Sequence, residues 1–196
     1  MSAIGDPTVQ AQDVLDFWFG PSPLVQARAE WFRKDPAFDG AIRARYSSTI
    51  ELALSQQLGP WQTSVPGQLA LILVLDQFTR NTRRDTPGAF AGDALALRLA
   101  QQLVASGDDQ ALPVWQRWFA YLPFEHSESR AVQTQSLPLF ARMAQQDPAM
   151  ADAHQWAVNH AQVVQRFGRY PHRNLVLGRV STAEELIFLA QPGSAF

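Results

Sequence analysis

Cysteine is absent from this chain of 196 residues. Its absence excludes a disulfide framework, a thiolate metal site and a cysteine nucleophile. Charged residues are also few, at 17% of the chain, where about a quarter is usual in globular proteins. Hydrophobic residues make up 46% of the sequence, which is enough for a packed core and argues against disorder.

Long apolar runs and a strong net charge are missing as well. The longest fully apolar run, residues 69–75, is far too short to span a bilayer. Residues 1–12 contain no basic stretch followed by an apolar core, so the sequence predicts no secretory signal. The formal net charge of -2 gives no field that would attract nucleic acid or an anionic membrane. We therefore expect a cytoplasmic protein without nucleic-acid or membrane partners.

Lysine is nearly absent, since Lys34 is the one lysine among sixteen basic residues. A GC-rich genome explains such a bias without any function. The alternative is that several arginines lie in buried pairs or face an anion, because the planar guanidinium is weakly hydrated and binds carboxylates and phosphates in a bidentate manner. The sequence leaves both explanations open.

Helix signals recur along the chain, whereas strand alternation and Asn-Gly hairpin turns do not occur. Asp35-Pro36 and Asp147-Pro148 are typical helix starts, because the aspartate caps the helix and proline suits its first position. The predicted helices cover residues 12–19, 25–32, 36–58, 64–80, 86–107, 113–122, 127–146, 148–167 and 182–190.

Prolines and a capping box mark the ends of several predicted helices. Pro123 is expected to end one helix, and Pro138 to kink or split another. Ser181 and Glu184 have the spacing of a capping box for a short C-terminal helix. Short connections make neighbouring helices antiparallel. The sequence therefore predicts one all-α domain over residues 1–196, a layered stack of antiparallel helix pairs similar to tetratricopeptide repeats.

The first candidate for a functional role is the polar end of the predicted 64–80 helix. Asp76 and Arg80 are four positions apart and share one helix face. One interpretation is an ion pair that orders the following loop. The other is that Arg80 directs its guanidinium at a ligand while Asp76 fixes its orientation.

The second candidate is the segment after Pro123. Glu125 and His126 lie where a new helix is expected, and the first backbone N–H groups of a helix can receive an anion. Acidic residues in a first helical turn also have a purely structural use. Capping is the better explanation for Ser127 and Glu128, whereas His126 is not explained as a cap.

The third candidate is the loop over residues 166–174. Arg169, His172 and Arg173 lie there between a glycine and a proline, and polar loops on a rigid scaffold often carry function. His160, on the preceding helix, is in a position to face the same way. Arg179 in the following segment is left unexplained by the capping box.

Five blocks of the sequence together resemble the bacterial domain-of-unknown-function family 924. The blocks extend over nearly the whole chain and cover residues 16–20, 69–81, 121–128, 167–174 and 177–185. The resemblance implies an all-helical fold similar to the tetratricopeptide-like superfamily, and it implies no activity, substrate or cofactor. Thr79 and Asp85 depart from the family pattern, which has proline and glycine at these positions.

Two functional hypotheses follow. In the first, the helical stack is a binding module for a peptide, a protein or a small anionic ligand, and some of the six tryptophans line a groove. In the second, the chain is an enzyme acting on a small anionic metabolite, with histidine as general acid or base and arginine stabilising negative charge. Both hypotheses use one set of candidate residues, namely Asp76, Arg80, Glu125, His126, Arg169, His172 and Arg173.

These residues are predicted to converge, because several of them lie near helix ends that meet on one side of an antiparallel stack. No His-x-x-x-His or Glu-x-x-His pair occurs, so the spacing favours no metal, and no cofactor is predicted. The oligomeric state is left open.

Overall fold

The computed structural model describes residues 10–20 and 27–194, and the regular elements within these ranges are all helical. The α-helices of the described residues are α1 (Ala11–Phe19), α2 (Pro36–Leu54), α3 (Val65–Ile72), α4 (Thr79–Thr82), α5 (Asp93–Ser106), α6 (Val114–Glu125), α7 (Arg130–Gln146), α8 (Ala151–Phe167) and α9 (Ala183–Leu189). The predicted all-α fold is thereby confirmed, whereas the tetratricopeptide-like stacking stays a prediction. None of the described helices has the length and apolar character needed to cross a membrane.

The chain forms two compact units. The first contains residues 1–84 and 88–123, and the second contains residues 85–87 and 124–196. Helices α1 to α5 belong to the first unit, and α7 to α9 belong to the second. The single domain expected over residues 1–196 stays a prediction.

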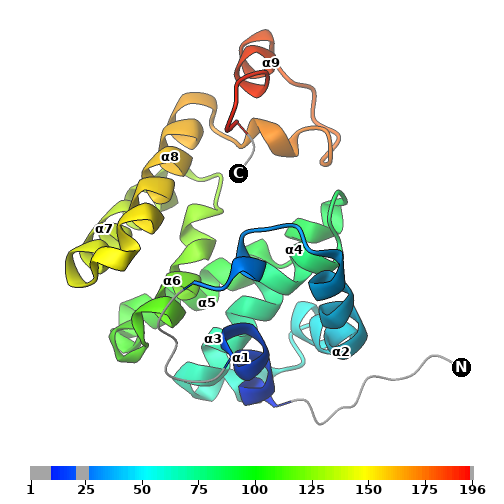
Figure 1. The fold of residues 1–196 in the computed structure, drawn as a ribbon, viewed down its shortest axis with the longest axis vertical. Helices are drawn as coiled ribbons and strands as arrows, with labels where there is room; N and C mark the ends of the chain where they lie inside the picture. The colour runs from blue at the N-terminus through cyan, green and yellow to red at the C-terminus, as the bar shows by residue number, and fades with distance from the viewer. Residues whose placement is uncertain (1–9, 21–26, 195–196) are drawn as a thin grey trace, which may run out of the picture. The chain divides into compact units, whose positions relative to one another are not determined.

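Helix α3 and the π-helical segment that continues it, Leu73–Phe78, form the centre of the first unit. From Leu69 to Leu75 each side chain is at most 3% exposed, as a helix that is apolar on every side predicts. Helix α3 packs against α1 and α5, and the π segment packs against α2 and α5 (Figure 1). This buried segment also carries Asp76.

Aromatic rings fill the rest of the first unit's core. The ring of Phe119 lies 5.4 Å from Trp18 and 4.7 Å from Trp31, in edge-to-face contacts. The ring of Phe78 lies 5.7 Å from Trp18 and 5.0 Å from Tyr46. Such pairs add to the free energy gained by burial alone. Trp18 and Trp31 are therefore core residues.

The helix predicted over residues 86–107 is interrupted. A 3-10 turn, Pro87–Phe90, comes first, and α5 begins at Asp93. Between them, Gly92 lies so close to the π segment that a Cβ atom would come within 2.2 Å of the carbonyl oxygen of Leu75. This close approach requires glycine and separates the turn from the helix.

Asp85 stands where the resemblance described above led us to expect glycine. Its φ angle is 59°, in the left-handed region that glycine adopts without steric cost. Aspartate is one of the few other residues that tolerate this region, so the departure keeps the backbone conformation that glycine would supply.

The prediction that Pro123 ends a helix was wrong, because α6 continues through Pro123 and ends two residues later, at Glu125. Pro138 does not split α7, and a kink at this position stays a prediction. Helix α7 begins at Arg130 with Ser129 in the cap position, slightly later than predicted.

Helices α7 and α8 pack side by side in the second unit (Figure 1). The Asp147 side chain accepts a hydrogen bond from the N–H of Ala149 at 2.9 Å, as the predicted cap requires. The residues that it caps form a 3-10 turn, Pro148–Met150, and α8 begins after that turn, at Ala151. Helix α8 ends at Phe167, and the next residue, Gly168, has a φ of 71° and is the left-handed terminator expected there. Residues 25–32 were predicted as a helix; part of that range lies outside the described residues, and Ala29–Trp31 forms a single 3-10 turn.

Candidate functional site

The loop between α8 and α9 is fixed to the second unit by two carboxylates. The first is Glu185, which accepts hydrogen bonds from the Arg169 guanidinium at 2.6 and 2.7 Å and from the Asn174 amide at 3.2 Å. The Glu185 carboxylate also accepts a hydrogen bond from the N–H of Thr182 at 2.8 Å. In return, the Thr182 hydroxyl oxygen accepts one from the N–H of Glu185. The capping box is therefore one residue later than the predicted one, which used Ser181.

The second carboxylate is Glu128. It accepts hydrogen bonds from the Arg179 guanidinium at 2.7 and 2.9 Å and from the N–H of Tyr170 at 2.8 Å. Arg179 also donates to the carbonyl oxygen of Tyr170 at 3.1 Å. Burial alone would raise the pKa of Glu128, but these hydrogen bonds hold it below its ordinary value. Glu128 was predicted to cap a helix, but it holds the loop through its hydrogen bonds to Tyr170 and Arg179. These bonds also give Arg179, which the sequence left without a role, a structural role.

The Arg169 pair gives a prediction for acid stability. Its hydrogen bonds lower the pKa of Glu185 from 4.5 to about 2. Because the folded-state pKa lies below the ordinary value, this stabilisation is complete above pH 4.5 and is lost as the pH falls toward 2. Glu185→Gln should therefore be less stable at neutral pH and lose less stability between about pH 5 and pH 2 than the wild type does.

The measurement is the urea midpoint at each pH. Glu184→Gln is the matched control, because Glu184 is 62% exposed and its pair with Arg166 is worth less than about 1 kcal/mol. Parallel pH profiles for wild type and Glu185→Gln would contradict the proposed tether.

Tyr170 is the centre of the candidate site and is fully buried. Its hydroxyl donates to the carbonyl oxygen of Glu125 and accepts from the amide nitrogen of Gln133 at 2.9 Å. Burial is the main cause that raises the pKa of Tyr170, so the phenol stays protonated. The rings of His160 and His172 lie 5.6 and 5.5 Å from that of Tyr170.

His160 comes from α8 and is 7% exposed. Its Nδ1 is 2.8 Å from the carbonyl oxygen of Trp156, one helical turn earlier, and 3.3 Å from a carboxylate oxygen of Glu125. Burial lowers the pKa of His160 to about 3, with further lowering from the charges of His126 and Arg173. The imidazole is therefore neutral at pH 7.

His172 and Arg173 belong to the 3-10 turn Pro171–Arg173 that follows Tyr170. The Arg173 guanidinium lies over the Tyr170 ring at 4.4 Å from its centre, and Arg173 is 7% exposed. The pKa of His172 is lowered to about 4, mainly by burial and secondly by the charge of Arg173. The ring of His126 lies 6.5 Å from that of His160. The second unit thus places His160, His172 and Arg173 against one buried tyrosine, with His126 beside His160.

Asp76 and Arg80 belong to the first unit. Arg80 is 3.1 Å from the Asp76 carboxylate, and it donates to both carboxylate oxygens of Asp93 at 2.8 and 3.0 Å. The predicted ion pair is therefore present. Asp93 was not predicted, because a partner thirteen residues away leaves no signal in the helical spacing.

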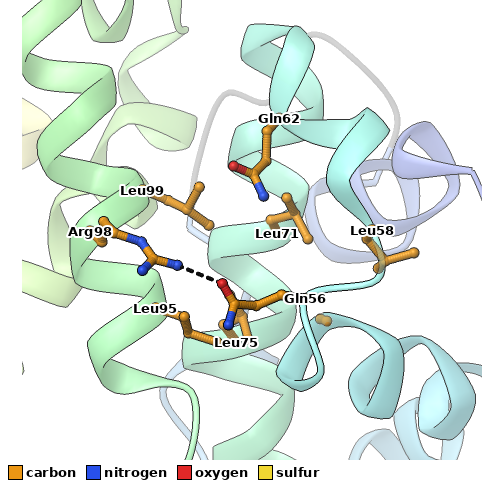
Figure 2. Close-up of a pocket in the computed structure, with 9 residues that line it drawn as sticks. Gln56, Leu58, Gln62, Leu71, Leu75, Leu95, Arg98 and Leu99 are labelled. Carbon is orange, nitrogen blue, oxygen red and sulfur yellow. Dashed lines mark hydrogen bonds between the residues drawn. The ribbon is translucent and has the colours of Figure 1, made fainter.

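The described residues of the first unit also form a shallow hollow (Figure 2). It has an apolar floor of leucines, and Arg98 donates to the Gln56 side chain at 2.9 Å across its rim. Its cavity volume is about 10 Å³, the room that one water molecule needs. The hollow is too small for an organic ligand.

The predicted site residues are thus divided between the two units. The second unit brings Glu125, His172 and Arg173 together around Tyr170, and His126 lies beside His160. Arg169 is in the same loop, but it is bound to Glu185. The convergence of Asp76 and Arg80 with the other five stays a prediction. Within residues 10–20 and 27–194 no group of His, Cys, Asp and Glu has the arrangement of a metal site.

Comparison with known proteins places the chain in a family. The pattern of a bacterial protein family of unknown function, DUF924, matches residues 14–193. The chain belongs to DUF924. Its fold is similar to the solved structure of ATU0120, a protein of unknown function from Agrobacterium tumefaciens, with 38% sequence identity and a TM-score of 0.81. That match covers 92% of this chain and 96% of the Agrobacterium protein. None of the curated proteins matches the chain.

Proposed function

We propose that the second unit of this DUF924 protein binds a small anionic ligand beside Tyr170, with Arg173 as the main cationic contact. The observation that carries the proposal is a charged guanidinium, 7% exposed, among three histidines. Guanidinium groups bind carboxylates and phosphates in a bidentate manner and keep their charge at every physiological pH.

The electrostatics support an anion at this point. His160 and His172 are neutral at pH 7, whereas Arg173 is charged, and its charge is one of the causes that lower the pKa of both histidines. The charges of Glu128 and Arg179 also act on His172. A bound anion would interact favourably with the Arg173 guanidinium.

The peptide alternative has less support. A peptide groove on a helical stack needs several exposed aromatic side chains. Trp18 and Trp31 are buried in the first unit, whereas Phe32 and Trp156 are exposed. The ring of Trp115 packs against Trp31 at 6.2 Å and against Trp118 at 5.9 Å. Most tryptophans described here pack on other rings, which favours a small ligand over a peptide.

The enzyme alternative also has less support from this site. A general base is most effective when its pKa is close to the working pH. The pKa values of His160 and His172, about 3 and about 4, make both weak bases near neutrality. Catalysis on a small anionic metabolite therefore stays a hypothesis, and binding is the function that we propose. The cytoplasmic location also stays a hypothesis.

Inorganic phosphate is the simplest probe of the proposal. At a hundred times its dissociation constant it should stabilise the wild type by about 2.7 kcal/mol. For a chain of this size that corresponds to a rise in melting temperature of roughly 5–10 °C. The measurement is a melting series in phosphate against chloride at equal ionic strength, because general salt screening then affects both series alike.

The variant that tests the contact is Arg173→Gln, which removes the charge and retains a polar side chain. It should lose the phosphate response. Arg166→Gln is the matched control in the same unit, because its side chain is 50% exposed and pairs with Glu184 at the surface. Equal melting temperatures in phosphate and chloride, for the wild type and both variants, would refute binding of inorganic anions.

A further inference from the structure

The loop over residues 168–182, which joins α8 to α9, is attached to the rest of the second unit through Tyr170 (Figure 1). The Tyr170 hydroxyl donates to the carbonyl oxygen of Glu125 and accepts from the amide nitrogen of Gln133, an uncharged residue of α7. The N–H of Tyr170 donates to the Glu128 carboxylate at 2.8 Å. Because the tyrosine is fully buried, the loop cannot leave its position without exposing this ring and its neighbours to water.

Two histidines and one arginine pack on the Tyr170 ring. The rings of His160 and His172 have their centres 5.6 and 5.5 Å from that of Tyr170, and the Arg173 guanidinium lies 4.4 Å from the same centre. A third histidine, His126, has its ring 6.5 Å from that of His160. A proton taken up by His160 or His172 therefore adds a positive charge to a buried cluster that already contains the guanidinium. Like charges repel one another strongly in such a place, because little water screens them.

The surroundings of His160 oppose its protonation on balance. Burial is the main cause that lowers the pKa of His160 to about 3, and three neighbouring charges lower it further, namely those of His126, Arg173 and His172. Two groups act in the opposite direction. The carbonyl oxygen of Trp156 accepts a hydrogen bond from Nδ1, and a carboxylate oxygen of Glu125 lies 3.3 Å from the same atom. Both favour the charged ring, but the effect of burial is larger.

His172 is held neutral in a similar way. Burial is the main cause that lowers its pKa to about 4, followed by the charge of Arg173. The charges of His126 and Arg179 also lower it, whereas the Glu128 carboxylate raises it. Other charged side chains beside the loop interact within the second unit, namely Arg130 with the carbonyl oxygen of Val164, Arg169 with Glu185 and Arg179 with Glu128. The packing of the loop thus keeps both histidines neutral at pH 7.

We propose that residues 168–182 are released from the second unit when His160 and His172 take up protons, at a pH at which the carboxylates of Glu128 and Glu185 are still ionised. Release exposes both imidazoles to water, where their ordinary pKa of 6.5 applies. Since their pKa values in the attached state lie below 6.5, the attachment is strongest above pH 6.5 and weakens as the pH falls toward 4. The Glu185 pair, by contrast, weakens only below pH 4.5. Release does not require the anion proposed above.

The test is amide hydrogen exchange of the intact chain at pH 7 and at pH 5, expressed as protection factors so that the pH dependence of the chemical exchange rate cancels. One histidine that regains its ordinary pKa on release multiplies the equilibrium constant for release by about twenty over this range. Protection of loop amides such as those of Tyr170 and Leu177 should therefore fall at least about twentyfold, while that of α7 falls less than about threefold. Unchanged protection of the loop would overturn the proposal. An equal loss in α7 would overturn it as well, because the unit would then open as a whole.

The double variant His160→Gln/His172→Gln tests the role of the two histidines, because glutamine keeps hydrogen-bonding groups and takes up no proton. Between pH 7 and pH 5 its loop protection should fall less than about threefold. His154→Gln is the matched control and should keep the wild-type loss, because His154 lies earlier on α8 and on a different face of that helix. A folded double variant with the wild-type loss would overturn the proposal. If the double variant does not fold, each single variant should show a smaller loss than the wild type, and an unchanged loss in both would overturn the proposal.

Discussion

Replacing Arg80 by alanine is expected to lower the free energy of unfolding by about 3–5 kcal/mol. The side chain of Asp76 is 1% exposed and that of Asp93 is 25% exposed, and Arg80 contacts both carboxylates. Removing the guanidinium leaves the neighbouring carboxylates of Asp76 and Asp93 without the cation that they share. The loss is large because a buried carboxylate that loses its partner keeps its full desolvation cost.

The measurement is chemical denaturation followed by circular dichroism. Arg83→Ala is the matched control from the next turn of the chain, because its partner Glu51 is 69% exposed. That change should cost less than about 1 kcal/mol. If Arg80→Ala cost no more than the control and instead abolished phosphate binding, Arg80 would be a ligand contact rather than part of the scaffold.

The second large effect is expected for Phe78→Ala, at about 3–5 kcal/mol. Phe78 is fully buried at the end of the π segment, and its ring contacts those of Trp18, Tyr46 and Phe17. Truncation removes these contacts and leaves a cavity in a core that can relax only in part.

Phe32→Ala is the matched control for this prediction. Phe32 is 56% exposed and stacks on Trp118 at 5.0 Å, so its removal should cost less than about 1.5 kcal/mol. Similar losses for the two phenylalanines would show that the π segment is not the core of the first unit. The loss at Phe78 should appear as a lower denaturant midpoint with an unchanged slope.

The parts of the fold that depend on neighbouring residues could be predicted from the sequence. The aspartate caps at Asp35 and Asp147 involve backbone groups two or three residues away, so the local pattern is sufficient. Gly92 is different, because its requirement for glycine comes from the carbonyl oxygen of Leu75, on another element. A single sequence contains no sign of that contact, and a continuous helix was predicted in its place.

The candidate site divides in the same way. The polar loop over residues 166–174 predicted a role for His172 and Arg173, and both residues lie against Tyr170. The same pattern drew attention to Arg169, whose partner Glu185 was assigned to no role in the sequence. Gln133 was missed altogether, because an uncharged residue inside a helix gives no signal until its neighbours are known.

The central claim is that an anion binds in the second unit against Arg173. The most direct test is a crystal structure of the protein grown with arsenate, a tetrahedral anion that keeps a proton near pH 7 and is located by its anomalous scattering. The account predicts an arsenate within hydrogen-bonding distance of the Arg173 guanidinium and close to the Tyr170 ring. An arsenate bound only elsewhere, or no bound arsenate at saturating concentration, would contradict it.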